Sequence, residues 1–126
     1  MSLEGSLKLK EISYIHSDAY QAGELKHGTI SLIKEGTVVF GIVTDEETRD
    51  KTISNIEEVV SRGAIPIYVG NEESNYENEV VVPKIHKKLQ PILVVPPLQM
   101  IAYYVAYKRG CNIDKPKNLA KSVTVE

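Results

Sequence analysis

The stretch TVVFGIVTDEETRDKTISNIEEVVSRGAIPIYV, residues 37–69, decides the fold. It opens with a short continuous apolar run at 37–43, which is typical of a strand covered on both faces. A capping box predicts that a helix begins at Thr44, and Gly63 predicts where that helix ends. A second apolar run at 65–69 completes a strand–helix–strand unit. This order predicts a three-layer α/β fold built on a parallel sheet.

Downstream of this unit, an acidic polar loop at 71–79 leads to a short strand at 80–82. A basic connector at 84–90 precedes the last predicted strand, at 91–95. The two prolines at 96 and 97 then begin a helix that is apolar nearly all round, so we expect it to be buried or to lie at an interface.

Upstream, the apolar periodicity predicts a helix over 4–16 and a helical turn over 29–33, and residues 19–22 could form a short strand. Domains with a parallel sheet usually begin with a strand, but this chain begins on a helix. Either the sheet lacks its first strand or the fold is unusual, and we expect the former. Residues 1–3 resemble a leader.

Composition limits the classes of function. The chain has 126 residues, of which 42% are hydrophobic and 25% are charged, as in one soluble globular domain. A net charge of −2 provides neither a basic stripe for nucleic acid nor a polybasic membrane anchor. The single cysteine, Cys111, excludes an internal disulfide and favours a reducing, cytoplasmic environment. The sequence contains no metal-ligand spacing, nucleotide-binding glycine motif or flavin motif, so we expect no cofactor.

Two opposite charges interrupt the apolar arc of the first helix. At about 100° per residue, Lys8 and Glu11 fall among Leu7, Ile12 and Ile15. A buried charge is costly unless it is paired, so these two side chains either serve a site or form an ordinary pair on a solvated face. Periodicity alone favours the ordinary pair.

Three segments carry a family resemblance: EGSLKLKEISYIHSDAYQAGELKHG at 4–28, SNIEEVVSRGA at 54–64, and PPLQMIAYYVAYKRGCNIDKPKNLAKSVTVE at 96–126. They resemble the second sugar-isomerase (SIS) subdomain of the glutamine–fructose-6-phosphate aminotransferases, also called glucosamine-6-phosphate synthases. The resemblance implies a SIS-type, flavodoxin-like sheet, with a partial second SIS subdomain at 4–110 and a C-terminal active-site tail at 111–126.

The same resemblance implies a function. Enzymes of this family convert fructose-6-phosphate and glutamine-derived ammonia to glucosamine-6-phosphate by aldose–ketose isomerisation. Their first SIS subdomain binds the sugar phosphate and has no counterpart in this sequence, so we expect the chain alone to be inactive. The family acts as a homodimer.

The resemblance also assigns roles to individual residues. Glu11 corresponds to the carboxylate that shuttles the proton, and its apolar neighbours would raise its pKa toward that of a base. Lys8 would orient that carboxylate or the developing oxyanion. His27, which in the family comes from the neighbouring subunit, would open the sugar ring. Lys121 would condense with the open-chain sugar as an imine, and Ala120 would offer backbone contacts to the substrate.

A non-catalytic SIS module that senses phosphosugars, or mediates assembly, is the alternative. The joint presence of Glu11, His27 and Lys121 favours catalysis, because a sensing module has no need of an imine-forming lysine.

Overall fold

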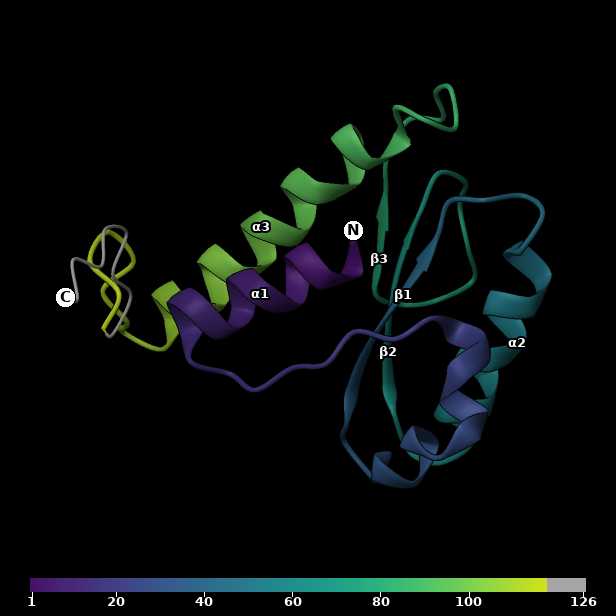
Figure 1. Cartoon of the computed structure of the whole chain (residues 1–126), viewed down its shortest axis with the longest axis horizontal. Helices are drawn as coiled ribbons and strands as arrows, with labels where there is room; N and C mark the ends of the chain where they lie inside the picture. The colour runs from purple at the N-terminus through teal and green to yellow at the C-terminus, as the bar shows by residue number, and fades with distance from the viewer. Residues whose placement is uncertain (118–126) are drawn as a thin grey trace, which may run out of the picture. The chain divides into compact units, whose positions relative to one another are not determined.

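The structure, a computed structural model, describes residues 1–117 of the chain. Within these residues the chain divides into two compact units. The first contains Met1–Ala19 and the residues from Val95 onward, and the second contains Tyr20–Val94. Figure 1 labels the helices and strands of both units.

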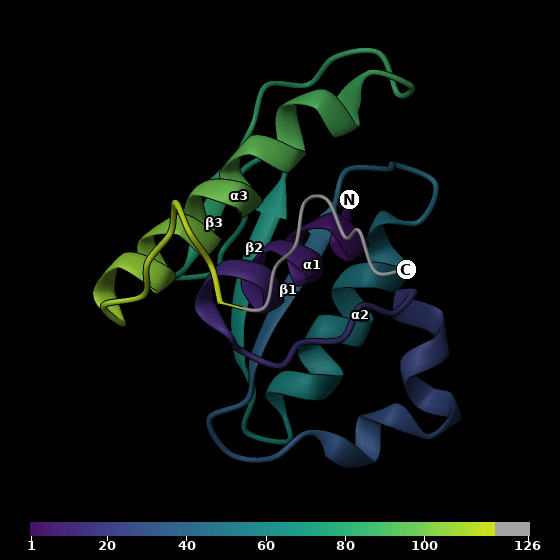
Figure 2. The ribbon, with the colours of Figure 1, turned by 60° about the vertical axis from the view of Figure 1, so that its left-hand side comes forward.

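A three-stranded parallel sheet forms the centre of the second unit (Figure 2). Its strands are β1 (Val38–Val43), β2 (Ile65–Gly70) and β3 (Glu79–Val81), in the spatial order β1-β2-β3. All of β1 pairs with all of β2, and only the end of β2 pairs with β3. This arrangement confirms the predicted α/β class with a parallel sheet.

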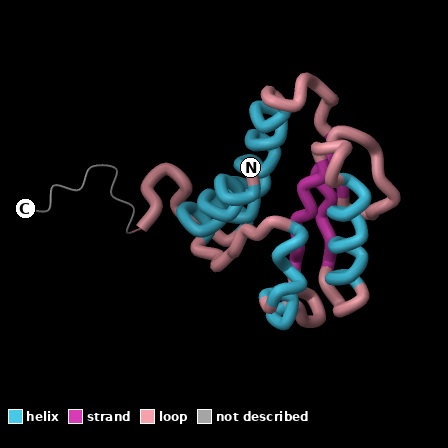
Figure 3. Tube along the Cα trace, turned by 45° about the vertical axis from the view of Figure 1, so that its right-hand side comes forward, coloured by secondary structure: helices cyan, strands magenta, loops and turns pink. Residues whose placement is uncertain are grey.

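The helix α2 (Arg49–Val60) covers one face of this sheet, as the tube in Figure 3 shows. The side chains of Val43, Tyr68 and Ile56 form the buried cluster between the sheet and the helix. Gly41 allows the helix to approach closely, because a Cβ at this position would lie 2.2 Å from Cδ1 of Ile56. The predicted strand–helix–strand unit is therefore confirmed as a β1–α2–β2 crossover.

The start of α2 differs from the prediction. The capping box at Thr44 does not form, and the helix begins at Arg49. Instead, Asp45 accepts a hydrogen bond from the backbone N–H of Glu47 through Oδ1, at 3.3 Å. Short Asp side chains compete with helix formation through such local bonds, which explains the intervening turn. Near the end of this helix Ile56 and Val59 are buried, whereas Val60 is exposed.

Gly63 closes the connection between α2 and β2 with a φ of +91°. A Cβ here would lie 2.2 Å from Oε2 and 2.9 Å from Cα of Glu35. The backbone N–H of Gly36 also donates to the Gly63 carbonyl at 2.9 Å. The position therefore requires glycine both for its backbone conformation and for space.

Replacing Gly63 with Ala is expected to lower the free energy of unfolding by about 1–3 kcal/mol, since the variant would combine an unfavourable φ with a backbone clash. Chemical denaturation followed by circular dichroism measures the change. Gly23→Ala is the matched control, because a Cβ at Gly23 would meet nothing within 4 Å. Equal stabilities of the two variants would contradict this explanation.

Two short 3₁₀ helices connect the first unit to the sheet: η1 (Ala22–His27) and η2 (Thr29–Leu32). The second confirms the helical turn predicted over 29–33. The described backbone contains no strand at 19–22, so the possible strand there is wrong.

In the first unit, α1 (Ser2–Ser13) begins and ends earlier than the predicted helix over 4–16. It ends because Tyr14 adopts the left-handed conformation, with φ 57° and ψ 27°. The N–H of Ile15 then donates to the Leu9 carbonyl at 3.4 Å. This is a C-terminal capping arrangement usually associated with glycine.

The strand predicted at 91–95 is wrong, because these residues belong to the helix α3 (Gln90–Lys108). Pro96 and Pro97, which were predicted to begin a helix, lie inside α3. Pro91 lies in the first turn, where the missing N–H is tolerated. Gln90 is buried and anchors this turn: its Nε2 donates to the Pro83 carbonyl at 3.1 Å, and its Oε1 accepts from the Ile85 N–H at 3.0 Å. The prediction failed because a short apolar run fits a buried strand and a buried helix equally well.

Within the first unit, α1 lies beside α3 (Figure 1). Gly5 permits the approach, since a Cβ there would lie 3.2 Å from Cδ1 of Leu98. Gln99 Nε2 donates to Glu4 Oε1 at 3.1 Å. One stripe of α3 is buried, comprising Leu98, Ala102 and Ala106. Other apolar side chains of this helix are exposed, namely Met100, Tyr103, Tyr104 and Tyr107. No helix within residues 1–117 is long and apolar enough to span a bilayer.

Candidate functional site

Lys8 and Glu11 form a direct ion pair on α1. The distance from Lys8 Nζ to Glu11 Oε2 is 2.7 Å, and Glu4 Oε1 lies 3.9 Å from the same ammonium. The side chains of Lys8 and Glu11 are 32% and 21% exposed, respectively. The pair is thus partly buried.

The pair has a clear electrostatic consequence for Lys8. The hydrogen bond to Glu11 raises the pKa of the Lys8 amine above its ordinary value, with further contributions from the charges of Glu11 and Glu4. Lys8 therefore remains a cation at neutral pH and holds the Glu11 carboxylate in one orientation. A carboxyl group held beside a permanent ammonium is a combination that can transfer a proton and stabilise a developing oxyanion.

Small polar side chains fix the segment that follows α1. Ser6 Oγ donates to the Ser17 carbonyl at 2.8 Å, and Ser17 Oγ donates to the Ser6 carbonyl at 3.0 Å. Ser13, which is fully buried, donates from Oγ to the Leu9 carbonyl at 2.6 Å. These bonds hold the helix and the following chain together in one arrangement. Nothing in the sequence indicates these serine contacts, because the spacing of the serines matches no motif.

Tyr14 connects α1 to the beginning of the C-terminal tail. Its hydroxyl accepts a hydrogen bond from the backbone N–H of Lys117 at 2.6 Å. No motif in the sequence predicts this role of Tyr14. Ala120 and Lys121, the predicted tail residues of the site, lie outside the described residues.

His27 belongs to the second unit, where it is the last residue of η1 and is exposed. Gly28 follows it with a φ of +141°, a conformation that favours glycine. The neighbouring Lys26 forms an ion pair with Glu58 of α2, with Nζ and Oε2 2.9 Å apart. This ion pair attaches the turn that carries His27 to the helix.

The ion pair with Lys26 predicts how the His27 turn responds to acid. The Lys26 hydrogen bond is the main cause that lowers the pKa of Glu58 below its ordinary value. A lowered carboxyl pKa means that the pair stabilises the fold above the ordinary Glu pKa, and that this stabilisation is lost as the pH falls through the lowered value. Amide chemical shifts of residues 24–28 are therefore expected to titrate with a midpoint below the ordinary Glu value, as measured by NMR.

In Glu58→Gln the same titration is expected to vanish, whereas Glu57→Gln, one position away, is expected to retain it. An unchanged titration in Glu58→Gln would show that another group controls the turn.

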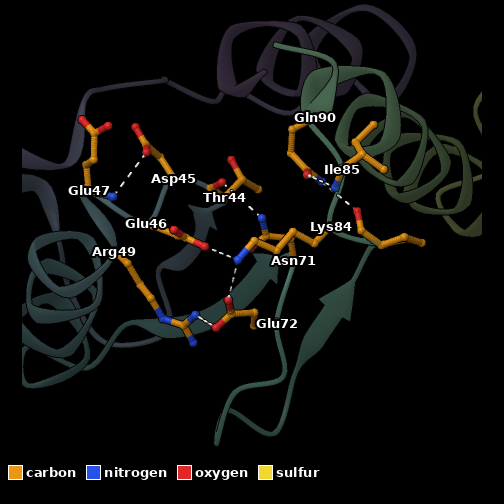
Figure 4. Close-up of polar contacts among 11 residues, drawn as sticks. Thr44, Asp45, Glu46, Glu47, Arg49, Asn71, Glu72, Lys84, Ile85 and Gln90 are labelled. Carbon is orange, nitrogen blue, oxygen red and sulfur yellow. Dashed lines mark hydrogen bonds and ion pairs between the residues drawn. The ribbon is translucent and has the colours of Figure 1, made fainter. Parts of the chain in front are cut away.

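A second group of polar residues lies at the carboxyl ends of β1 and β2 (Figure 4). Arg49 pairs with Glu72, and Lys84 pairs with Glu46 and reaches Glu72 Oε1 at 3.3 Å. Asn71 Nδ2 donates to the Thr44 carbonyl at 3.2 Å. These contacts tie the loops after the two strands to the segment after β3. Among residues 1–117, no group of three or more His, Cys, Asp or Glu side chains is arranged to hold a metal ion.

The chain is similar to known proteins. A family model of the SIS domain matches residues 1–109. A glutamine--fructose-6-phosphate aminotransferase [isomerizing] of Clostridium tetani is 56% identical over 131 aligned residues, which cover 100% of this chain. The chain spans 22% of the length of that relative.

Two solved structures are also similar. The C-terminal domain of a glucosamine-fructose-6-phosphate aminotransferase from Francisella tularensis has a TM-score of 0.78 and 39% identity, covering 88% of this chain and 33% of that one. A glucosamine-6-phosphate deaminase from Thermotoga maritima has a TM-score of 0.76 and 30% identity, covering 97% of this chain and 36% of that one.

Proposed function

The chain belongs to the SIS domain family, and from that premise we propose that it contributes catalytic residues to the sugar-isomerising centre of a glutamine–fructose-6-phosphate aminotransferase. The Lys8–Glu11 pair is the observation that carries this proposal, because it presents a partly buried carboxylate beside a cation. The names of the similar proteins support the same substrate class, since they specify fructose-6-phosphate or glucosamine-6-phosphate.

Moving a carbonyl between C2 and C1 of a ketose requires ring opening and then proton transfer between adjacent carbons. Glu11 is the base that removes the proton and returns it, and Lys8 fixes its carboxylate. His27 transfers the proton that opens the ring, since an imidazole exchanges protons near neutral pH.

Lys121 supplies the covalent step. Its neutral amine adds to the open-chain carbonyl and releases water to form an imine, which requires a site that lowers the lysine pKa. Ala120 provides backbone contacts to the sugar. Both residues are assigned by family resemblance alone.

The complete centre includes contributions from outside this chain. The sugar phosphate binds to another SIS subdomain, His27 acts in the neighbouring subunit of a homodimer, and ammonia derives from glutamine. We place the enzyme in the cytoplasm.

A chimaera tests the proposal: residues 1–126 replace the matching segment of the Clostridium tetani relative. The chimaera is expected to form glucosamine-6-phosphate from fructose-6-phosphate and glutamine, and the isolated chain is expected to show no turnover. A chimaera that is folded and hydrolyses glutamine, but makes no amino sugar, would refute the proposed function. Turnover by the chain alone would refute the need for a second subdomain.

A further inference from the structure

Gln99 of α3 contacts the helix that carries Lys8 and Glu11. Its side-chain amide donates from Nε2 to Oε1 of Glu4 at 3.1 Å. The same oxygen of Glu4 lies 3.9 Å from the Lys8 ammonium, which is too far for a hydrogen bond. Lys8 donates instead to Oε2 of Glu11, at 2.7 Å. One ammonium therefore lies near two carboxylates and is hydrogen-bonded to only one of them.

The spacing along α1 does not explain this choice of partner. Glu4 precedes Lys8 by four residues, and a glutamate four positions before a lysine is the more stabilising order on a helix. Glu11 follows Lys8 by three residues, a spacing that also allows a pair. An isolated helix would therefore bond Lys8 to Glu4 at least as readily as to Glu11. A contact from outside α1 accounts for the difference.

Gln99 supplies a contact of this kind. Its chain neighbour Leu98 is buried, and a Cβ at Gly5, the neighbour of Glu4, would lie 3.2 Å from Leu98 Cδ1. The two helices thus approach each other closely at this point, which places the Gln99 amide beside Glu4. Because the amide is bonded to the Glu4 oxygen near the ammonium, it holds that oxygen out of hydrogen-bond distance of Lys8.

Glu4 remains a competitor for the ammonium. The hydrogen bond to Glu11 is the main cause that raises the pKa of the Lys8 amine, and the charge of Glu4 adds a smaller contribution in the same direction. The attraction between Glu4 and Lys8 is therefore already present. A small rotation of the Glu4 side chain would turn it into a direct bond.

We propose that Gln99 is a positioning residue for sugar isomerisation: it restrains the Glu4 carboxylate, so that the Lys8 ammonium stays bonded to Glu11. This inference rests on the proposed role of Glu11 as the base, although the restraint itself can be measured without turnover. When the amide is removed, Glu4 takes the ammonium for part of the time. The Glu11 carboxylate is then less often in the orientation that proton transfer needs, and the loss appears in kcat.

NMR of the folded chain tests the restraint. The scalar coupling across a hydrogen bond, from ¹⁵Nζ of Lys8 to a side-chain carboxyl ¹³C, identifies the bonded carboxylate. The wild type is expected to show this coupling to Glu11 and not to Glu4. Gln99→Met keeps an unbranched side chain of similar length but has no amide, so the Glu11 coupling is expected to fall by about half or more and a Glu4 coupling to appear. Lys108→Met, in the last turn of α3, is the control and should change neither coupling.

Kinetics of the chimaera with the Clostridium tetani relative test the consequence. Gln99→Met is expected to lower kcat for amino-sugar formation by about three- to tenfold, as for the loss of one hydrogen bond, with little change in KM. In the Glu4→Gln background the same substitution is expected to have no effect, because no competing carboxylate remains. A general disturbance of the packing between α1 and α3 would instead lower kcat equally in both backgrounds.

The two experiments separate this inference from the proposed function. An unchanged coupling between Lys8 and Glu11 in Gln99→Met would overturn the inference. So would an equal loss of kcat with and without the Glu4 carboxylate, or wild-type kcat in Gln99→Met of an active chimaera. A folded chimaera that makes no amino sugar would refute the proposed function instead, and the couplings alone would then decide whether Gln99 restrains Glu4.

Discussion

Replacing Glu11 with Gln is expected to slow sugar isomerisation by about 10²- to 10⁴-fold in the chimaera with the Clostridium tetani relative. Gln has nearly the same size as Glu and can still accept a hydrogen bond from Lys8, so the helix retains its packing. An amide, however, cannot remove a proton from a sugar carbon. The loss should therefore appear in kcat for amino-sugar formation, with little change in KM for fructose-6-phosphate.

Two measurements make this result specific. Glutamine hydrolysis in the same preparations is expected to persist, because it does not use α1. Glu4→Gln is the matched control: Glu4 lies on the same helix and its carboxylate is 3.9 Å from the same ammonium, but it has no proposed role in proton transfer. Synthase rates within a few-fold of wild type in Glu11→Gln, or an equal loss in Glu4→Gln, would exclude Glu11 as the base.

Replacing Lys121 with Arg is expected to abolish isomerisation in the chimaera and to abolish imine formation with it. A guanidinium stays protonated in proteins and cannot attack a carbonyl, although it preserves the positive charge. Borohydride reduction in the presence of fructose-6-phosphate is expected to leave a sugar adduct on Lys121 of the wild-type chimaera, detected by mass spectrometry of its peptides.

Lys117→Arg provides the comparison in the same tail. The described contact of Lys117 is made by its backbone N–H, so this substitution should leave both activity and trapping intact. A sugar adduct on another lysine, or substantial turnover by Lys121→Arg, would rule out the imine assignment.

The fold could be predicted where the sequence signal is local. The runs at 37–43 and 65–69 form strands β1 and β2, because each is a short apolar segment bounded by turn residues. The run at 91–95 has the same apolar pattern but is helical. Its helical conformation depends on contacts of the buried Gln90 with Pro83 and Ile85. Hydrophobic periodicity within one short window carries no information about such contacts.

In the candidate site, too, local contacts could be predicted from the sequence and tertiary contacts could not. Lys8 and Glu11 are one helical turn apart, so their pairing could be predicted from spacing. The bonds of Ser6 with Ser17 join residues 11 positions apart, and the bond between Tyr14 and Lys117 joins residues 103 positions apart. Such contacts depend on the tertiary fold, so no pattern in the sequence indicated them.

The bond from Lys117 to Tyr14 has a consequence for which substitutions the chain can accept. Tyr14 contributes its side chain, whereas Lys117 contributes only its backbone N–H. In a saturation library, position 117 should therefore accept almost any residue except proline, which has no N–H to donate. Position 14 should be much less permissive, because glycine would relax its left-handed backbone but would lose the hydroxyl. Two positions joined by one hydrogen bond would then accumulate substitutions at very different rates.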